Sequence, residues 1–310
     1  MKIVVTGGAG FIGANLCRRL VDDDRVRDVV VVDDFSTGRR DNLAGLDVSI
    51  AEGSILDAPL LDRAFVGAHA VVHLAARPSV PLSVQDPVHS HNINTNGTLG
   101  VLEALRRSDG AGCVVASSSS VYGPNPVLPT SESHAPRPRS PYAASKLATE
   151  SYALAWGSTY SLPVIAFRFF NVYGPLQPAD HAYAAVMPAF ISRALRGEPL
   201  VINGDGTQTR DFTYIDTVTE VLARAAIERT ASTAPVNLAF GGRTSLLEVV
   251  ELIGEISGET LEVQHREPRP GDVPHSQALN ESLQQLFADL DPIELRDGLS
   301  QTIEWWRSKR

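Results

Sequence analysis

The feature that most constrains the fold stands at the start of the chain. An apolar run over residues 2–6 is followed at once by GGAGFIG, with glycines at positions 7, 10 and 13. Glycines at this spacing allow a tight turn and place the N-terminus of a helix against a pyrophosphate. A second apolar run, residues 29–32, ends in Asp33, about 20 residues past the last glycine, where an acidic residue binds adenosine ribose hydroxyls. This order of elements predicts a dinucleotide-binding fold.

The residue after the second strand also bears on which dinucleotide binds. Asp33 rather than a basic residue favours NAD over NADP. Arg39 and Arg40 follow closely and are the residues that weigh against this preference.

Short apolar runs continue to alternate with helical spacing through the first half of the chain. The expected strands are residues 48–51, 70–74, 113–116 and 163–167, and residues 99–107 have the spacing of a helix. This alternation predicts an α/β fold with a doubly wound parallel sheet. Ligands of such sheets lie beyond the carboxyl ends of the strands. We therefore expect the glycine turn, the small pair Ala75-Ala76 and Ser118 to meet at one crevice.

A second informative stretch runs from ASSSSVYG (116–123) to SPYAASK (140–146). Tyr142 and Lys146 are four residues apart, so on a helix they lie on the same face. A phenol has a pKa of about 10, and a nearby ammonium lowers it toward the range of a useful base. The serine run supplies a hydroxyl that can share a hydrogen bond with the substrate. An amphipathic helix also produces such a pair by chance, and the predicted dinucleotide site is what gives it a catalytic meaning.

The alternation of strand and helix patterns becomes irregular after residue 174. We expect a dinucleotide domain over residues 1–174, to which a segment near 212–240 returns, and a smaller, mostly C-terminal α/β substrate domain over residues 175–310. Within the second domain, residues 183–196 are expected as a helix interrupted at Pro188, and residues 204–214 as a polar loop.

Charge and composition exclude several classes. A formal net charge of −9 argues against a nucleic-acid or membrane-surface binder, so an anionic ligand would need local arginines. No apolar run approaches membrane-spanning length, and the start of the chain has no signal pattern. Cys17 and Cys113 show neither metal-binding spacing nor a disulfide framework. A cytoplasmic enzyme or binding protein without a metal is the expectation.

Several ordered motifs together resemble one family. TGGAGFIG, the acid after the second strand, SSSSVYG, SPYAASK, RFFNVYGP, GDGTQTRDFTY and PRPGD resemble the extended short-chain dehydrogenase/reductase family, and within it the nucleotide-sugar 4-epimerases of the UDP-glucose type. The likeness spans essentially the whole chain. It implies a Rossmann domain that binds NAD, a smaller domain that binds a UDP-sugar, and a homodimer formed through helices at residues 99–107 and 145–156.

The resemblance also implies residue roles. Tyr142 is the base, Lys146 holds the nicotinamide ribose and tunes the phenol, and Ser118 is the hydroxyl partner. The implied cofactor positions are Gly7, Gly10, Phe11, Ile12, Gly13, Asp33, Ser54, Ile55, Leu74, Ala75, Ala76 and Asn94, together with Tyr142 and Lys146. The implied substrate positions are Ser118, Ser119, Ser120, Asn171, Val186, Arg210, Arg269, Asp272 and Ser276.

Three positions qualify the resemblance. Ser54 stands where the family often has Asp, so the adenine loses a carboxylate acceptor, and Pro78 stands where the best-known epimerases often have Lys. Ser276 stands where enzymes restricted to plain hexoses have a bulky Tyr, which implies room for a C2 N-acetyl group unless the loop collapses into that space.

The implied reaction is inversion at the sugar C4 through a transient 4-keto sugar. Dehydratases and decarboxylases of the family carry carboxylates where this chain has Ser119 and Ser120, which favours simple epimerisation. The same two hydroxyls suit a C6 carboxylate, so UDP-glucuronate 4-epimerisation stays open. A sensor that binds NAD without catalysis is the alternative from another class, and the intact set of Ser118, Tyr142 and Lys146 argues against it.

Overall fold

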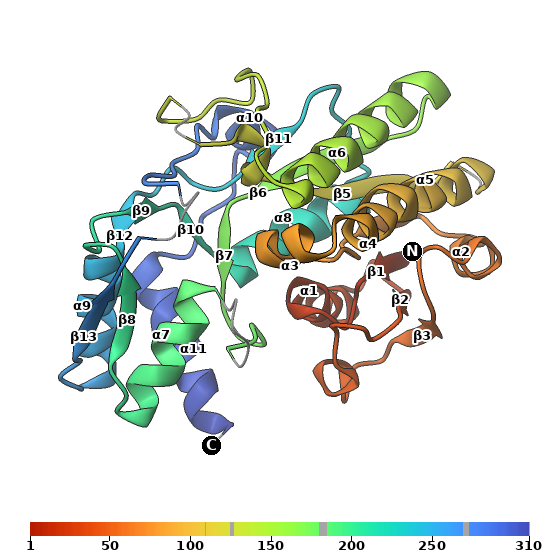
Figure 1. Cartoon of the computed structure of the whole chain (residues 1–310). Coiled ribbons are helices and arrows are strands. Elements are labelled where there is room, and N and C mark those ends of the chain that lie inside the picture. Colours follow the sequence, from red (N-terminus) through yellow and green to blue (C-terminus); the bar gives the residue numbers. More distant parts are fainter. Residues whose placement is uncertain (109, 125–126, 180–184, 269–272, 310) are drawn as a thin grey trace. The chain divides into compact units, whose positions relative to one another are not determined.

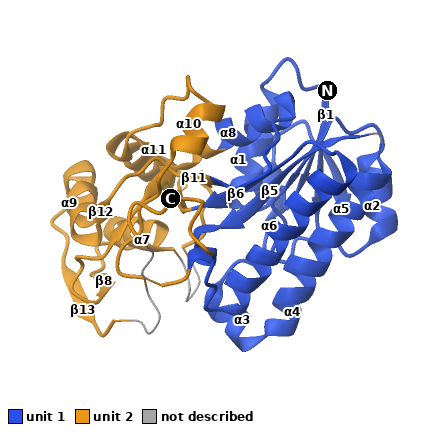
Figure 2. Ribbon diagram, turned by 90° about the horizontal axis from the view of Figure 1, so that it is seen from above, with its two compact units in different colours: residues 1–122, 136–169, 219–236 blue, residues 123–135, 170–218, 237–310 orange. Residues whose placement is uncertain are grey.

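The computed structural model describes residues 1–108, 110–124, 127–179, 185–268 and 273–309 (Figure 1). The chain divides into two compact units, coloured separately in Figure 2. Unit 1 comprises Met1–Tyr122, Pro136–Phe169 and Thr219–Val236, and unit 2 comprises Gly123–Ala135, Phe170–Val218 and Asn237–Arg310.

The central sheet has seven strands in the order β11-β6-β5-β4-β1-β2-β3. Its strands are β1 (Lys2–Thr6), β2 (Asp28–Asp33), β3 (Ser49–Glu52), β4 (Ala70–His73), β5 (Gly112–Ser118), β6 (Val164–Phe169) and β11 (Val236–Leu238). All the described pairings from β3 to β6 are parallel. The strand order reverses between β1 and β4, so the sheet is doubly wound and has its switch point there, as predicted.

Helices cover both faces of this sheet. Helices α5 (Gly97–Arg107) and α6 (Pro141–Tyr160) lie on one face, with α2 (Ala58–Phe65) beside α5, and α1 (Phe11–Val21) lies with α8 (Ile215–Glu228) on the other (Figure 2). Strands β1, β4 and β6 are almost wholly buried because both faces are covered. Among the described residues, no helix is both long enough and apolar enough to cross a membrane.

Two short helices, α3 (Val80–Gln85) and α4 (Pro87–His91), follow β4 and lead through a π-helical turn (Asn92–Asn96) into α5. The sequence pattern did not predict them, since the stretch is rich in proline. Both prolines lie in first turns, where a missing N–H costs nothing. Ser79 and Asp86 cap the two helices by accepting from backbone N–H groups.

Unit 2 contains short strands and four described helices. Strand β7 (Asn171–Tyr173) pairs with β10 (Phe212–Tyr214), β9 (Thr209–Arg210) with β12 (Thr244–Ser245), and β8 (Leu200–Asn203) with β13 (Val263–Arg266). The helices are α7 (Val186–Arg196), α9 (Leu246–Ser257), α10 (Glu281–Leu286) and α11 (Leu295–Ser308).

Two expectations for this half were wrong. Helix α7 begins at Val186, so Pro188 lies in its first turn and does not interrupt it, because no intrahelical N–H is needed there. The segment expected as a polar loop contains β9 and β10, whose two or three residues are too few to show a strand pattern. Gly123–Ala135 also belongs to unit 2, where Thr130 donates its N–H to Gln277 and accepts from Asn237.

Candidate active site

The turn after β1 has the geometry of a phosphate cradle. Gly7 has a φ of +72°, and a Cβ on it would lie 2.7 Å from the backbone N of Ala75. A Cβ on Gly13 would overlap the carbonyl oxygen of Gly7. No side chain caps the N-terminus of α1, and its first turn holds no acidic residue. The N–H groups at Phe11 and Ile12 therefore suit an anion, and the turn fits a dinucleotide pyrophosphate.

Asp33, the last residue of β2, holds this turn in place. Its Oδ2 accepts from the N–H of Ala9 at 2.9 Å, and its Oδ1 accepts from the N–H of Phe35 at 2.8 Å. Burial raises the pKa of Asp33, and these two backbone hydrogen bonds oppose that rise. A carboxylate has about four acceptor positions, so two remain for ribose hydroxyls.

The segment after β4 is locked to the same edge. Leu74 donates its N–H to the carbonyl of Thr6, and Ala75 donates to the Thr6 hydroxyl, so both predicted residues lie beside the glycine turn. Asn94 is buried; its Oδ1 accepts from the N–H of Arg77 at 2.7 Å and its Nδ2 donates to Ser145 Oγ at 2.9 Å. Asn94 thus clamps the loop that contains Ala76 to α6.

The two remaining cofactor positions, Ser54 and Ile55, follow β3. Ser54 Oγ accepts from the N–H of Leu56 at 3.2 Å, and Ile55 is buried against Gly97 at the start of α5. Their role toward a cofactor stays a prediction.

Helix α6 carries the predicted base and lysine. Ser140 caps the helix by accepting from Ala143 N–H, which puts Tyr142 in the first turn and Lys146 one turn later. Lys146 is buried, and its Nζ donates to the carbonyl of Ala116 at 2.9 Å. Burial lowers the pKa of Lys146 to about 8.

Ser118, the last residue of β5, lies against Tyr142. Its Oγ accepts from both the N–H (3.2 Å) and the hydroxyl (2.9 Å) of Ser120. Ser118 therefore has its own proton to donate, and its hydrogen bond to Tyr142 lowers the pKa of the phenol against the larger effect of burial, which raises it. Ser120 thus supports Ser118, and its expected contact with substrate stays a prediction. Ser119 begins the 3-10 turn η3 (Ser119–Tyr122).

Below these groups lies a buried ion pair that the sequence pattern did not reveal. Glu150 on α6 and Arg168 on β6 are joined at 2.6 Å, and their side chains are 4% and 3% exposed. Ser117 donates to the same carboxylate at 2.8 Å. The position of Glu150, one turn past Lys146, was the available signal, as was the single charge in the apolar strand β6.

His73, at the end of β4, is a second buried group that was missed. Its Nδ1 lies 2.8 Å from the Thr6 hydroxyl and its Nε2 lies 3.0 Å from the Thr98 hydroxyl. Because Thr98 donates its proton to the carbonyl of Asn94, the ring must donate from Nε2 and accept at Nδ1. Burial, with the positive charge of Lys146, lowers the pKa of His73 to about 3, so the ring is neutral.

In unit 2, taken by itself, the structure brings together three of the predicted substrate residues. Arg210 donates from Nη1 to the carbonyl of Pro274, and Ser276 donates its N–H to Thr209. Asn171 donates its N–H to the carbonyl of Asp211. Val186 lies apart from them along the chain, as the first residue of α7. Arg269 and Asp272 lie outside the described residues.

Asp211 was not singled out from the sequence, although it lies between Arg210 and Phe212. Its side chain is fully buried, and Oδ2 accepts from the N–H groups of Gly241 and Ala278, both at 3.0 Å. Burial raises its pKa to about 6 against these hydrogen bonds. The carboxylate ties the strand that carries Arg210 to two neighbouring loops.

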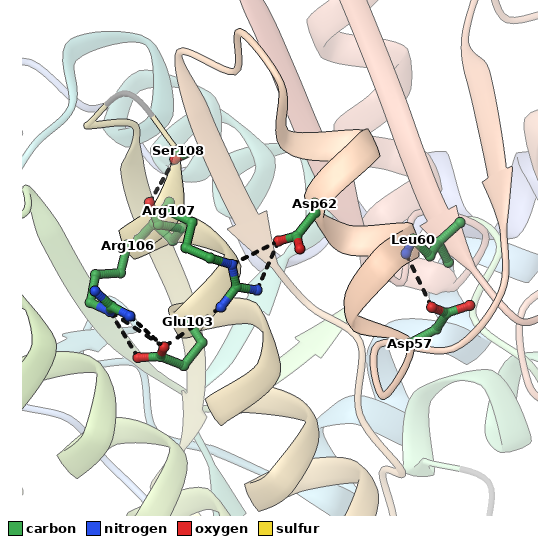
Figure 3. Close-up of polar contacts among 8 residues, drawn as sticks. Asp57, Leu60, Asp62, Glu103, Arg106, Arg107 and Ser108 are labelled. Carbon is green, nitrogen blue, oxygen red and sulfur yellow. Dashed lines mark hydrogen bonds and ion pairs between the residues drawn. The ribbon is translucent and has the colours of Figure 1, made fainter.

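A hollow of about 310 Å³ lies elsewhere in unit 1, between α2 and α5. It is lined by Asp62, Phe65, Val66, Gly67, Ala104, Arg107 and Ser108. Figure 3 shows the polar contacts of Asp62, Arg107 and Ser108. Both helices end there, a few residues before β4 and β5 begin, so the hollow is at the amino edge of the sheet. Ligands of doubly wound sheets bind at the opposite edge.

Fold and site together define a dinucleotide-dependent enzyme of the α/β class, with a tyrosine, a lysine and a serine at the carboxyl edge of its sheet, next to β5. The chain belongs to the NAD dependent epimerase/dehydratase family, which it matches over residues 3–239. The resemblance inferred from the motifs is thereby confirmed.

Individual relatives are similar over their full length. The chain is 36% identical to the UDP-glucose 4-epimerase of Mycolicibacterium smegmatis, covering 100% of this chain and 99% of that protein. The structure resembles UDP-N-acetylglucosamine 4-epimerase from Methanobrevibacter ruminantium in complex with UDP-N-acetylmuramic acid (TM-score 0.93, 34% identity, 100% and 99% of the two chains). It also resembles UDP-glucose 4-epimerase from Thermus thermophilus in complex with NAD (TM-score 0.89, 34% identity, 100% of both chains).

Proposed function

We propose that this chain is an NAD-dependent UDP-sugar 4-epimerase that works through a transient 4-keto sugar. The observation that carries the proposal is the placement of Tyr142, Lys146 and Ser118 at the same sheet edge as the glycine turn and Asp33. The family and the relatives described above support the same reaction.

In this proposal, residues of unit 1 have separate roles at the sugar C4 carbinol. NAD, held by the glycine turn and Asp33, would supply a reversible hydride acceptor at the sugar C4. The Tyr142 phenolate accepts the O4 proton in the first half-reaction and gives it back in the second. The Ser118 hydroxyl, supported by Ser120, stabilises the phenolate by hydrogen bonding. Lys146, a buried cation one turn away, adds electrostatic stabilisation and binds the nicotinamide ribose.

In this proposal, residues of unit 2 bind the nucleotide part of the substrate. Arg210, with Arg269 and Asp272, holds the diphosphate and ribose, because a planar guanidinium suits phosphate oxygens. Asn171 and Val186 contact the substrate. The hexose must be held loosely, since it has to present both faces of C4 to the same ring. Ser276 is half-buried and small, which favours a substrate with a C2 N-acetyl group.

A substrate panel tests the proposal. UDP-glucose, UDP-N-acetylglucosamine and UDP-glucuronate are incubated separately with the enzyme, and the products are identified by NMR. We expect the C4 epimer of at least one of the two neutral sugars. Conversion of UDP-glucuronate alone, without release of carbon dioxide, would transfer the assignment to UDP-glucuronate 4-epimerisation.

Tyr142→Phe tests the chemistry directly. General acid–base groups contribute about 10²- to 10⁴-fold, so we expect kcat to fall by that factor while the protein stays folded and still binds NAD. Wild-type turnover in a folded Tyr142→Phe enzyme would exclude the mechanism, and tight NAD binding without turnover of any nucleotide sugar would indicate a sensor.

We also propose that the enzyme is a cytoplasmic homodimer that associates through α5 and α6. On α6, Tyr152, Trp156 and Tyr160 form a series of edge-to-face rings with centroids 5.9 and 5.5 Å apart. Tyr152 is 38% and Tyr160 43% exposed, and this pair of exposed aromatic rings, two turns apart on one helix, suits a helix from a second copy. Sedimentation of wild type against Tyr152→Glu tests this, and a wild-type monomer would exclude it.

A further inference from the structure

The buried pair of Glu150 and Arg168 lies directly beneath the catalytic groups. Tyr142, Lys146 and Glu150 are spaced four residues apart on α6, so they form one stripe along one face of the helix. Both members of the pair are almost fully buried, so water does not solvate either charge. The mechanism described above does not use them.

Their contacts reach three elements besides α6. Glu150 Oε1 accepts from Arg168 Nη2 at 2.6 Å, and Oε2 accepts from Arg168 Nε at 2.9 Å, a bidentate pairing with β6. Oε2 also accepts from Ser117 Oγ on β5 at 2.8 Å. The guanidinium lies over the ring of Tyr122, 4.6 Å from its centroid, at the end of η3.

These contacts hold both ends of the segment that carries Ser118. Ser117 immediately precedes Ser118, and Tyr122 ends the turn that contains Ser119 and Ser120. The Ser117 hydroxyl also lies 3.4 Å from the carbonyl of Lys146, so the segment is tied to the catalytic helix at that point as well. A buried, bidentate ion pair has one favourable geometry, because breaking it leaves an uncompensated charge out of water.

We propose that Glu150 and Arg168 are a positioning pair, which fixes residues 117–122 so that the Ser118 hydroxyl stays directed at the phenol oxygen of Tyr142. Neither residue touches substrate or cofactor in this proposal. The inference rests on the proposed function, since it assigns the pair a role in activating Tyr142 as the base.

The consequence is a dependence of the Tyr142 pKa on a residue two helical turns away. If the segment loosens, Ser118 donates less well to the phenolate, and the pKa of Tyr142 rises. The charged groups described around this site are Lys146 and Glu150 on α6 and Arg168 on β6, and the ring of His73 on β4 is neutral. Helix α3 packs against α6 with no charged side chain, and α4 has only the exposed His89 and His91.

Glu150→Gln is the decisive variant. Glutamine keeps the size and can still accept from Ser117, but it cannot accept both guanidinium donors or balance the charge. We expect kcat to fall about tenfold with KM for the UDP-sugar changed less than about twofold, because the nucleotide grip is untouched. The ascending limb of the kcat–pH profile should move to higher pH by about half a unit to one unit.

The phenol is also titrated without turnover. The absorbance of phenolate near 295 nm is measured against pH in the NAD-bound enzyme, and the curve of a matching Tyr142→Phe protein is subtracted. The phenolate titration curve of Glu150→Gln should move to higher pH, as the ascending limb of its kcat–pH profile does. Ser118→Ala should give a similar shift, and the double variant should add little, because both changes remove the same hydrogen bond.

Arg107→Met, which removes the exposed ion pair with Asp62 at the amino edge of the sheet, is the matched control. It should leave both the kcat–pH profile and the phenolate titration curve unchanged. If Glu150→Gln does not fold, Ser117→Ala replaces it and should give a smaller shift of the same sign. A folded Glu150→Gln or Ser117→Ala enzyme with an unmoved limb and an unmoved phenolate curve would overturn the positioning role. If Tyr142→Phe and Ser118→Ala themselves leave turnover intact, the proposed function fails instead.

Discussion

Two of the arginine–carboxylate pairs described in unit 1 lie at opposite edges of the central sheet. At the carboxyl edge the side chains of Arg168 and Glu150 are 3% and 4% exposed, with nitrogen and oxygen 2.6 Å apart. At the amino edge the side chains of Arg107 and Asp62 are 41% and 47% exposed and 2.8 Å apart (Figure 3). Arg107 also lies 3.6 Å from Glu103, which pairs with Arg106. The chemistry is the same, and the surroundings differ.

Burial, rather than the presence of an ion pair, decides what an arginine does in this fold. Water can replace Asp62 as the partner of Arg107, so that pair contributes little and fixes nothing. Water does not reach Arg168 to replace Glu150 as its partner. Arg168 therefore holds its neighbours in one arrangement. The catalysis that we propose at the carboxyl edge needs preorganised donors, whereas the hollow at the amino edge is lined by charges that are already solvated.

The largest expected effect comes from removing one arginine of each pair. Arg168→Met leaves Glu150 buried without a cation and should cost about 3–5 kcal/mol of the free energy of unfolding. Arg107→Met should cost less than about 1 kcal/mol. Urea unfolding of the two variants side by side measures the difference, and equal costs would break the comparison.

The next largest effect is a loss of stability in acid, caused by His73 at the carboxyl edge. The folded pKa of His73 is about 3, below its ordinary value of about 6.5, so the unfolded state binds more protons between these pH values. Stability is therefore lost as pH falls below 6.5, by roughly 3 kcal/mol at pH 4. His73→Gln, which keeps one donor and one acceptor, should flatten this acid limb. An equally steep limb in the variant would mean that His73 is not the group responsible.

Asp211 in unit 2 is a buried carboxylate that accepts from backbone N–H groups and has no paired cation among its described contacts. Its charged form is therefore less stable in the folded protein than in water. Its folded pKa of about 6 exceeds the ordinary value of about 3.9, so the folded state binds more protons in that interval. Its contribution to stability is complete below pH 4 and is lost as pH rises through 6, by roughly 2 kcal/mol. The stability difference between wild type and Asp211→Asn, measured from pH 4 to 7, should show this slope, opposite in sign to that of His73.

The sequence was most informative where local chemistry decides the structure. The glycines at 7, 10 and 13, the acid at Asp33 and the buried strands follow from steric limits and apolar runs that are visible in any short window. The position of Tyr142 and Lys146 on one face of α6 was also predictable, because residues four apart on a helix lie one turn apart.

The residues that support the site were not predictable, because their contacts are not local in the sequence. Glu150 and Arg168 are 18 positions apart and meet only because α6 packs on β5 and β6. Asp211 contacts residues 30 and 67 positions away, and a two-residue strand such as β9 carries no periodicity. Tertiary packing creates these contacts, and no local pattern encodes them.

The smallest expected effect concerns salt. The exposed pair of Arg107 and Asp62 acts through solvent, where 1 M salt reduces the screening length to about 3 Å, whereas the buried pair is shielded from ions. The stability difference between wild type and Arg107→Met, below about 1 kcal/mol in dilute buffer, should therefore vanish in 1 M sodium chloride. The difference between wild type and Arg168→Met should stay within experimental error of its low-salt value. If salt abolished both differences, water and ions would reach Glu150, and the rigid support inferred for Ser118 would not exist.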